Sequence, residues 1–323
     1  MLQSKVMTVR EKKMKRKDIL LSILLVTLWG LNFTVIKLGL GGVPSMLLVA
    51  LRYLFTAFPA IFFIKKPKTE LKYIILYGLM VGVGQFSCLF YSMQIGMPAG
   101  IASIVLQIQA FISPVLAMIF LNEKINKKQI IGFLTAAVGL ALIAAASAGD
   151  NTNKIPVLAF VLLLCAPLFW AISNIVLRIA SDKAAAKGEK LNTISMVVWS
   201  GLIPPIPMMG LALMLDTPET LVNVLKNLSG ISIFAVIYLA FAATLTGYGI
   251  WSMLVSTYPM SIVAPIPLLV PVVALLSARI ILSEKLSLMQ WSGFIVILAG
   301  LVISNVNINT IKNLFGKPKA TVE

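Results

Sequence analysis

Ten apolar runs follow one another along the chain, separated by shorter stretches richer in polar and charged residues. They lie at residues 19–38, 44–64, 71–93, 98–121, 129–147, 157–178, 193–215, 231–254, 260–282 and 288–306. Apolar runs of about 18 or more residues are candidates for transmembrane helices. Lipid offers no partners for backbone N–H and C=O groups, so helices are expected, and the alternating pattern of a membrane barrel is absent. The pattern predicts an all-α integral membrane protein with ten transmembrane helices.

The second half of the chain repeats the first at an offset of 161 residues, which relates Tyr77 to Tyr238 and Pro98 to Pro259. The same frame relates Glu123-Lys124 to Glu284-Lys285, Gln129 to Gln290, Gly132 to Gly293, and Gly139 to Gly300. Matches of Pro, Gln, Gly and Glu-Lys in one ungapped frame indicate an internal repeat, whereas Leu and Ile matches are expected in any apolar chain. Each copy contains five predicted helices, and an odd number inverts the second copy in the membrane. Inverted repeats are typical of transporters that work by alternating access.

These patterns divide the chain into five parts. We expect a basic tail at 1–18, a first five-helix repeat at 19–147, a polar linker at 148–156, a second five-helix repeat at 157–307 and a C-terminal tail at 308–323. The second repeat is longer than the first, and its extra residues are expected to form loops around 179–192 and 215–230. Cys88 and Cys165 both lie within predicted helices, so they are expected to be unpaired packing residues.

The net charge of +16 comes from Lys and Arg that gather on one predicted side of the membrane. Basic residues cluster before the first run, between runs two and three, four and five, and six and seven, and after the tenth. By the positive-inside rule both termini are cytoplasmic. The clusters are read as topology signals that contact anionic lipid headgroups, and not as a nucleic-acid surface. With 59% apolar and 12% charged residues, the chain is unlike a soluble domain, in which about a quarter is charged.

Polar side chains inside the first two runs are the first candidates for a binding site. Trp29, Asn32 and Lys37 fall near one face of the first predicted helix. Asn32 needs a polar partner, so it is expected to face either a cavity or a neighbouring helix. Lys37 lies near the end of the helix, where it is expected to extend to the membrane interface. Arg52 is costly in the second run, and the sequence leaves open whether it contacts a substrate anion or helix carbonyls.

The third and eighth runs combine small residues with a polar or aromatic stripe. Gln85 lies near the stripe that Gly78 and Gly82 form, and small residues let helices approach closely. In the corresponding region of the second repeat, Tyr248 and Trp251 share a face with Thr244. Such a stripe suits a small polar ligand, although plain aromatic packing produces the same pattern.

The fourth and ninth runs are expected to be broken or kinked helices. Gln107 shares a face with Gly100 and Ser103, whereas Gln109 is expected to point away from Gln107 and outside the same cavity. Pro114 is expected to kink the fourth helix. The ninth run contains Pro259, Pro265, Pro267 and Pro271. Broken helices at matching places in two repeats point to a transporter's binding site, while kinks without a ligand role remain the alternative.

Several kinds of chemistry are missing from the sequence. The chain has no His, and none of its 11 acidic residues lies in the middle of an apolar run. Paired-Asp, HExxH and Ser-His arrangements are absent, as are a phosphate-binding glycine motif and a metal-ligand cluster. We therefore expect no enzyme activity, cofactor or metal. The usual groups of an intramembrane proton relay are also absent, so the coupling mechanism stays open.

Specific stretches resemble the EamA family of drug/metabolite transporters. They are WGLNFTVIK, FPAIFF, GMPAGIASIVLQIQAF, VVWSGLIPPIP, YLAFAATLTGYGIW and APIPLLVPVVALLSA, and the resemblance covers residues 17–307. Within the family the likeness is greatest to exporters of cysteine and O-acetylserine. The resemblance implies ten helices in two EamA repeats, efflux across the bacterial inner membrane and a cavity between helices 1, 3, 4, 6, 8 and 9. The residues that would line this cavity are Trp29, Asn32, Gln85, Gln107, Trp170, Asn174, Tyr248 and Trp251.

The hypothesis that follows is export of cysteine-pathway metabolites or similar small neutral amino acids, by a monomer or homodimer in contact with membrane lipids. Small multidrug relatives carry a carboxylate in the first helix, and its absence here disfavours cationic drugs. A second hypothesis is efflux of aromatic amino acids or other amphipathic metabolites and drugs, which would use the Trp and Tyr side chains. A third is a membrane scaffold without transport activity.

Overall fold

The computed structural model describes residues 14–149, 155–258, 263 and 266–305, and these residues are almost entirely helical. The first half contains α1 (Arg16–Leu40), α2 (Ser45–Ala60), α3 (Leu71–Tyr77), the π-helix η1 (Gly78–Gln85), α4 (Phe86–Gln94), α5 (Ala99–Leu106), α6 (Gln109–Leu121) and α7 (Lys127–Gly149). The second half contains α8 (Val157–Ala186), α9 (Thr193–Ser200), α10 (Pro205–Leu215), α11 (Pro218–Lys226), α12 (Gly230–Ile237), the π-helix η2 (Tyr238–Thr246), α13 (Gly247–Thr257), the 3₁₀ helix η3 (Ile266–Leu269), α15 (Val270–Ile281) and α16 (Leu288–Asn305). The predicted all-α class is confirmed.

Six helices among the described residues are long and apolar enough to cross a membrane. A seventh is added if α9 and α10, which meet at a bend of 42°, form one span. Three further apolar helices are shorter, at Ser45–Ala60, Ile266–Ile281 and Leu288–Ser304. The chain is therefore a multi-pass membrane protein, and many large apolar side chains are accordingly exposed on its outside, such as Phe63 and Ile206.

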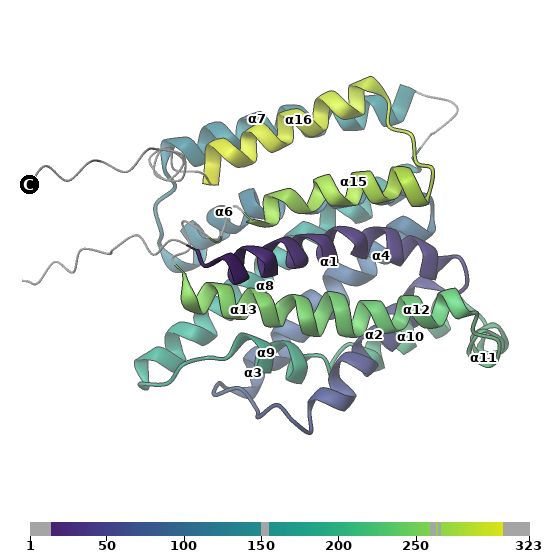
Figure 1. Cartoon of the computed structure of the whole chain (residues 1–323), viewed down its shortest axis with the longest axis horizontal. Coiled ribbons are helices and arrows are strands. Elements are labelled where there is room, and N and C mark those ends of the chain that lie inside the picture. Colours follow the sequence, from purple (N-terminus) through teal and green to yellow (C-terminus); the bar gives the residue numbers. More distant parts are fainter. Residues whose placement is uncertain (1–13, 150–154, 259–262, 264–265, 306–323) are drawn as a thin grey trace, which may run out of the picture.

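The helices run side by side, with α1 inside the bundle and the pair α7 and α16 along one edge (Figure 1). α1 packs against α15, α12, α13 and α5, so elements from both halves of the chain surround it. The first residues of α1 and the α6–α7 connection lie at the left end in Figure 1, and the α15–α16 connection lies at the right end. The elements of both halves therefore form one bundle with two distinct ends.

Residues related by the 161-residue offset adopt the same local structure. The π-helices η1 and η2 occupy matching positions, since Gly78 corresponds to Leu239 and Gln85 to Thr246. Asn122 and Ser283, which also correspond, are the described non-glycine residues with positive φ, at 55° and 57°. Asn122 is the C-cap of α6 and Ser283 follows the C-cap of α15, and a left-handed residue at such a place terminates many helices. The repeat seen in the sequence is thus a repeat of backbone structure.

The helices that follow these two turns also begin in the same way. Asn126 and Gln129 form a reciprocal capping box before α7, with side-chain oxygens accepting from backbone N–H groups at 2.9 and 2.8 Å. Ser287 and Gln290 form the equivalent pair before α16, at 3.2 and 2.9 Å. α7 and α16 therefore start in corresponding local structures.

Glycines bring α7 and α16 into close contact. A Cβ at Gly132 would lie 2.6 Å from the carbonyl oxygen of Gly300, and a Cβ at Gly139 would lie 2.6 Å from that of Gly293. Gly132 corresponds to Gly293 in the repeat and Gly139 to Gly300, so the two contacts map onto each other when the repeats are exchanged. The two helices pack as closely as their backbones permit.

Two expectations about regular structure are wrong. Residues 179–186, expected as loop, continue α8, and most of the expected loop at 215–230 is the helix α11. α11 has an apolar side, with Leu221 buried, and Thr217 caps its first turn by accepting from the backbone N–H of Thr220 at 3.2 Å. The prediction assigned helices only to long apolar runs. It therefore placed these shorter, more polar segments in loops, although one continues a helix and the other forms a separate helix.

Breaks in the fourth and ninth runs were expected, but the fourth break lies elsewhere. The helix ends at Leu106 and resumes at Gln109, while Pro114 lies inside α6. In the ninth run, the 3₁₀ helix η3 includes Pro267, and Pro271 follows near the start of α15. Pro259 and Pro265 lie outside the described residues.

Candidate functional site

Two neighbouring cavities lie in the centre of the bundle. The inner cavity has a volume of about 60 Å³ and is lined by Trp29, Asn32, Phe33, Arg52, Gln85, Phe86, Leu89, Ser103, Leu106, Gln107, Trp170, Ala243, Tyr248, Pro267 and Val270. The outer cavity has a volume of about 430 Å³ and shares Trp29, Gln107, Trp170, Tyr248 and Pro267 with the inner one. Both halves of the chain supply lining residues, so the cavities lie between the two repeats.

All eight candidate residues line these cavities. Trp29, Gln107, Trp170 and Tyr248 line both of them. Asn32 and Gln85 line the inner cavity, and Asn174 and Trp251 line the outer one. A substrate-binding role for these residues stays a prediction.

The expected orientation of Gln109 is wrong, because Gln107 and Gln109 both line the outer cavity. An unbroken helix would turn their side chains apart, but the helix is interrupted between α5 and α6. Gln107 donates from Nε2 to the carbonyl oxygen of Pro267 at 3.0 Å, and Gln109 accepts from Asn174 Nδ2 at 3.2 Å. The two amides thus link the first repeat to two different elements of the second.

Aromatic rings form a wall along both cavities. The ring of Trp29 lies 5.5 Å from that of Tyr248, at 61°, and 5.9 Å from that of Trp251, at 46°. The indole N–H of Trp29 donates to the carbonyl oxygen of Ala243 at 3.0 Å. A Cβ at Gly247 would lie 2.4 Å from this indole nitrogen, so only glycine lets Trp29 take its place. The wall is therefore fixed by packing between α1 and α13.

Arg52 is the charged side chain of the inner cavity, and only 3% of it is exposed. Its guanidinium donates to Thr244 Oγ1 from Nε at 3.2 Å and from Nη2 at 3.0 Å, and from Nη1 to Asn32 Oδ1 at 3.5 Å. It also lies over the ring of Phe86, 4.2 Å from the centroid. The sequence singled out Arg52 as costly in a membrane helix but did not assign it to the site.

The two π-helices contribute to the inner cavity from opposite repeats. Gln85 is the last residue of η1, and Ala243 and Thr244 belong to η2. Thr244 donates its hydroxyl to the carbonyl oxygen of Leu239 at 2.7 Å, which leaves Oγ1 free to accept from Arg52. π-helical turns are frequent at functional sites because they alter the direction of side chains.

Polar contacts close the bundle at the end where α5 begins. Glu284 accepts from the backbone N–H groups of Ala99 and Gly100, at 2.7 and 3.0 Å. Lys37 donates to the carbonyl oxygens of Met93 and Met97 at 2.7 and 3.3 Å. The ammonium group of Lys37 thus binds carbonyls near the end of α4, and its extension to the membrane interface stays a prediction.

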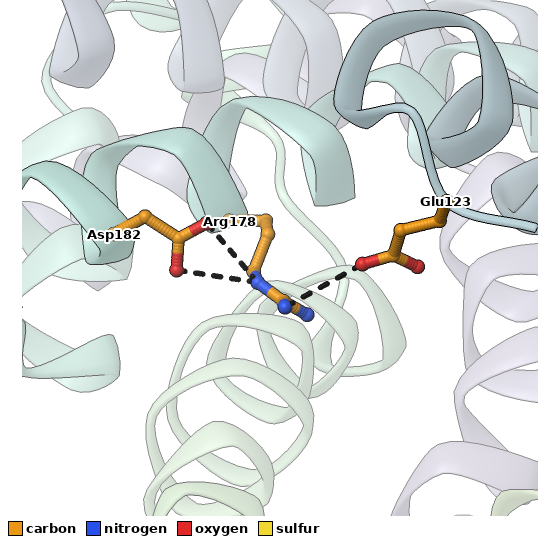
Figure 2. Close-up of polar contacts among 3 residues, drawn as sticks. All are labelled: Glu123, Arg178 and Asp182. Atoms are coloured by element: carbon orange, nitrogen blue, oxygen red, sulfur yellow. Dashed lines mark hydrogen bonds and ion pairs between the residues drawn. The ribbon is translucent and has the colours of Figure 1, made fainter.

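The opposite end of the bundle gives the outer cavity an exposed mouth. Arg178 there lies between Glu123 and Asp182 (Figure 2), with Nη2 3.5 Å from Glu123 Oε1 and Nε 3.3 Å from both Asp182 carboxylate oxygens. Arg178 and Glu123 both line the outer cavity. Their side chains are 58% and 51% exposed, so the cavity reaches the surface at this end. Glu123 and Glu284 correspond in the repeat, yet one lies at an open mouth and the other holds a helix inside the closed end.

Among the described residues, no group of three or more His, Cys, Asp or Glu side chains could hold a metal ion. Cys88 and Cys165 are half-buried free thiols and line neither cavity. The arrangement is suited to binding a small molecule that enters from one end.

The EamA-like transporter family model matches residues 16–145 and 157–306. The chain belongs to this family. The EamA resemblance predicted from sequence is confirmed, and the EamA-like domain occurs twice along the chain.

Two bacterial relatives match nearly the whole EamA-like chain. One from Salmonella typhimurium strain LT2 is 42% identical over 291 residues, covering 90% of this chain and 95% of the relative. One from Escherichia coli strain K12 is 41% identical over 291 residues, with the same coverage. Both carry the name probable amino-acid metabolite efflux pump. A solved crystal structure of a protein shares the fold, with a TM-score of 0.59 and 15% identity over 89% of this chain and 98% of the other.

Proposed function

We propose that this protein is a secondary transporter of the bacterial inner membrane that exports small amino-acid-type metabolites, such as cysteine or O-acetylserine, by alternating access. In this proposal, ten transmembrane helices form two inverted five-helix repeats. The three shorter apolar helices then cross the membrane together with the longer ones and the bent pair. The central cavities bind the substrate, and the two repeats exchange conformations to release it on the other side.

The observation that carries the proposal is a cavity between the repeats with one open and one closed end. Trp29 and Gln107 come from the first repeat, and Trp170 and Tyr248 from the second. Glu284 holds the closed end, whereas its counterpart Glu123 faces the mouth. Corresponding residues in different environments are expected when each repeat takes one of two conformations.

Charge supports the direction of transport. Ion pairs join Lys68 to Glu189 and Lys183 to Glu70, at 3.1 and 3.7 Å, so the loops near these residues lie at the same end of the bundle. These loops are rich in lysine, and by the positive-inside rule this end faces the cytoplasm. Arg178 at the mouth of the outer cavity and Lys183 at this lysine-rich end both belong to α8. The open cavity therefore faces the cytoplasm in this proposal. A substrate destined for export would load from there.

The dimensions of the cavities support a small polar substrate. A water molecule needs roughly 10–15 Å³ of cavity volume. The inner cavity of about 60 Å³ therefore suits the polar part of a small amino acid. The outer cavity offers room for a side chain. The relatives named as probable amino-acid metabolite efflux pumps favour the same class of substrate.

The aromatic wall favours a second candidate function, the export of aromatic amino acids or other amphipathic molecules. The ring of Trp29 lies within stacking distance of Tyr248 and of Trp251, and all three line the outer cavity. Aromatic rings gain about 0.5–1.5 kcal/mol from such contacts beyond the burial of apolar area.

Counterflow in proteoliposomes tests the proposal. Vesicles are preloaded with unlabelled cysteine, and uptake of external labelled cysteine is followed without a pH gradient. Transient accumulation that protein-free vesicles lack is the expected result. Counterflow of labelled phenylalanine without counterflow of cysteine would replace the first candidate by the second. The absence of counterflow with either substrate, for a folded protein, would support a scaffold without transport activity.

A further inference from the structure

Arg52 carries a buried charge with no carboxylate partner in the described part of the chain. The ion pairs there join other side chains, all of them more than a third exposed. Arg52 is instead held by the neutral oxygens of Thr244 and Asn32 and by the ring of Phe86. A charge within a membrane protein is costly unless it is paired, and such residues mark substrate pathways.

Gln85 adds a second unsatisfied group to the same cavity. Its side chain is 3% exposed, and among the described residues its Oε1 is a buried side-chain oxygen without a hydrogen-bond partner. Leaving a buried acceptor unpaired is unfavourable, so a ligand that donates to it is favoured. The inner cavity therefore holds an unneutralised cation and an unused acceptor.

We propose that the inner cavity recognises a zwitterion, with Arg52 binding the carboxylate of the substrate and Gln85 Oε1 accepting from its ammonium group. This proposal rests on the proposed function and specifies which end of the substrate each residue binds. The side chain of the substrate then extends toward Trp29 and Tyr248, which line both cavities.

The hydrogen bonds of Arg52 leave room for this role. A guanidinium has five N–H donors in a planar fork that suits carboxylates. Three hydrogen bonds are present, and the one to Asn32 is at the limiting distance of 3.5 Å. Two donors remain, and both Arg52 and Gln85 line the cavity. The neutral partners hold the guanidinium in place without neutralising it.

A purely structural role for Arg52 would give the same contacts but not the same ligand preference. The test compares L-cysteine with cysteamine, which lacks the carboxylate, and with 3-mercaptopropionate, which lacks the amine. Binding to purified protein in nanodiscs is followed by tryptophan fluorescence, since Trp29 and Trp170 line the cavity. Binding does not require the transport cycle, so transport-defective variants can still be measured.

For the wild type, we expect cysteine to bind about 10- to 100-fold more tightly than cysteamine, as a charge-assisted hydrogen bond contributes about 1.5–3 kcal/mol. Arg52→Met should bring the ratio of the two dissociation constants close to one, and Arg52→Lys should give an intermediate ratio. Gln85→Leu should keep this ratio but remove the preference for cysteine over 3-mercaptopropionate. Arg279→Met, at an exposed position of α15, is the matched control and should keep both preferences.

The ratios separate this proposal from folding defects and from the proposed function. An Arg52→Met protein that elutes as a folded species and keeps the wild-type preference for cysteine over cysteamine overturns the role of Arg52. Wild-type binding with these preferences but no counterflow would contradict the proposed function alone. If cysteine does not bind, phenylalanine, phenethylamine and 3-phenylpropionate provide the same comparison. A wild-type protein that binds none of the six compounds overturns both proposals.

Discussion

Replacing Glu284 with glutamine tests whether one carboxylate holds the closed end of the bundle. Ala99 and Gly100 lie in the first turn of α5, where backbone N–H groups have no intrahelical partner. Glu284 accepts from both, at 2.7 and 3.0 Å. Its negative charge also interacts favourably with the positive end of the helix dipole.

The magnitude follows from the change in hydrogen bonding. A charge-assisted hydrogen bond contributes about 1.5–3 kcal/mol and a neutral one about 1 kcal/mol. Glutamine keeps one acceptor oxygen, so the variant loses one charge-assisted bond and weakens the other. Because Glu284 is only half-buried, solvent screening reduces the loss. We expect local opening at Ala99 and Gly100 to become easier by about 2 kcal/mol, which corresponds to roughly 30-fold.

Hydrogen-exchange mass spectrometry of the protein in nanodiscs measures this opening directly. Peptides that contain Ala99 and Gly100 should exchange about 30-fold faster in Glu284→Gln than in the wild type. Glu219→Gln is the matched control, because Glu219 lies in the first turn of the exposed helix α11. Exchange at these two amides that is equal in Glu284→Gln and the wild type would refute the assignment of Glu284 as the contact that holds this end closed.

Two further predictions concern the cavity wall and the glycine contact. Trp170→Ala and Tyr248→Ala should each lower the initial rate of counterflow about tenfold or more, because substrate contacts are lost. Lys226→Ala, in the last turn of α11, should leave this rate unchanged. Equal rates in all three variants at matched protein amounts would contradict the placement of the substrate. Gly139→Val should lower the free energy of unfolding by about 1–3 kcal/mol or more, because its Cβ would lie 2.6 Å from a carbonyl oxygen of α16. Gly210→Val, at a position with no atom within 4 Å of the added Cβ, should shift the thermal transition much less, and similar shifts for both variants would contradict the role of the close contact.

The sequence predicted the candidate site better than it predicted local breaks in the helices. Asn32 was recognised because an amide in an apolar run needs a partner, and Gln85 because it lies beside a stripe of small residues; both line the inner cavity. The predicted orientation of Gln109 was wrong, because the prediction assumed a continuous helix through Gln107. The role of Arg52 stayed open, since one chain position does not reveal whether a carboxylate from another helix lies nearby.

Hydropathy alone was enough for the all-helical membrane class, because any chain segment in lipid must satisfy its own backbone hydrogen bonds. The offset of 161 residues likewise predicted the structural repeat, down to the matching turns at Asn122 and Ser283. The difference between Glu123 and Glu284 was not predictable, because equivalent sequences carry the same local information. Their partners come from packing between distant segments, with Ala99 and Gly100 meeting Glu284 and Arg178 meeting Glu123. Local pattern therefore specifies the helices and their repetition, whereas contacts between the repeats decide which end is closed and which charge lies beside the cavity without a carboxylate partner among the described residues.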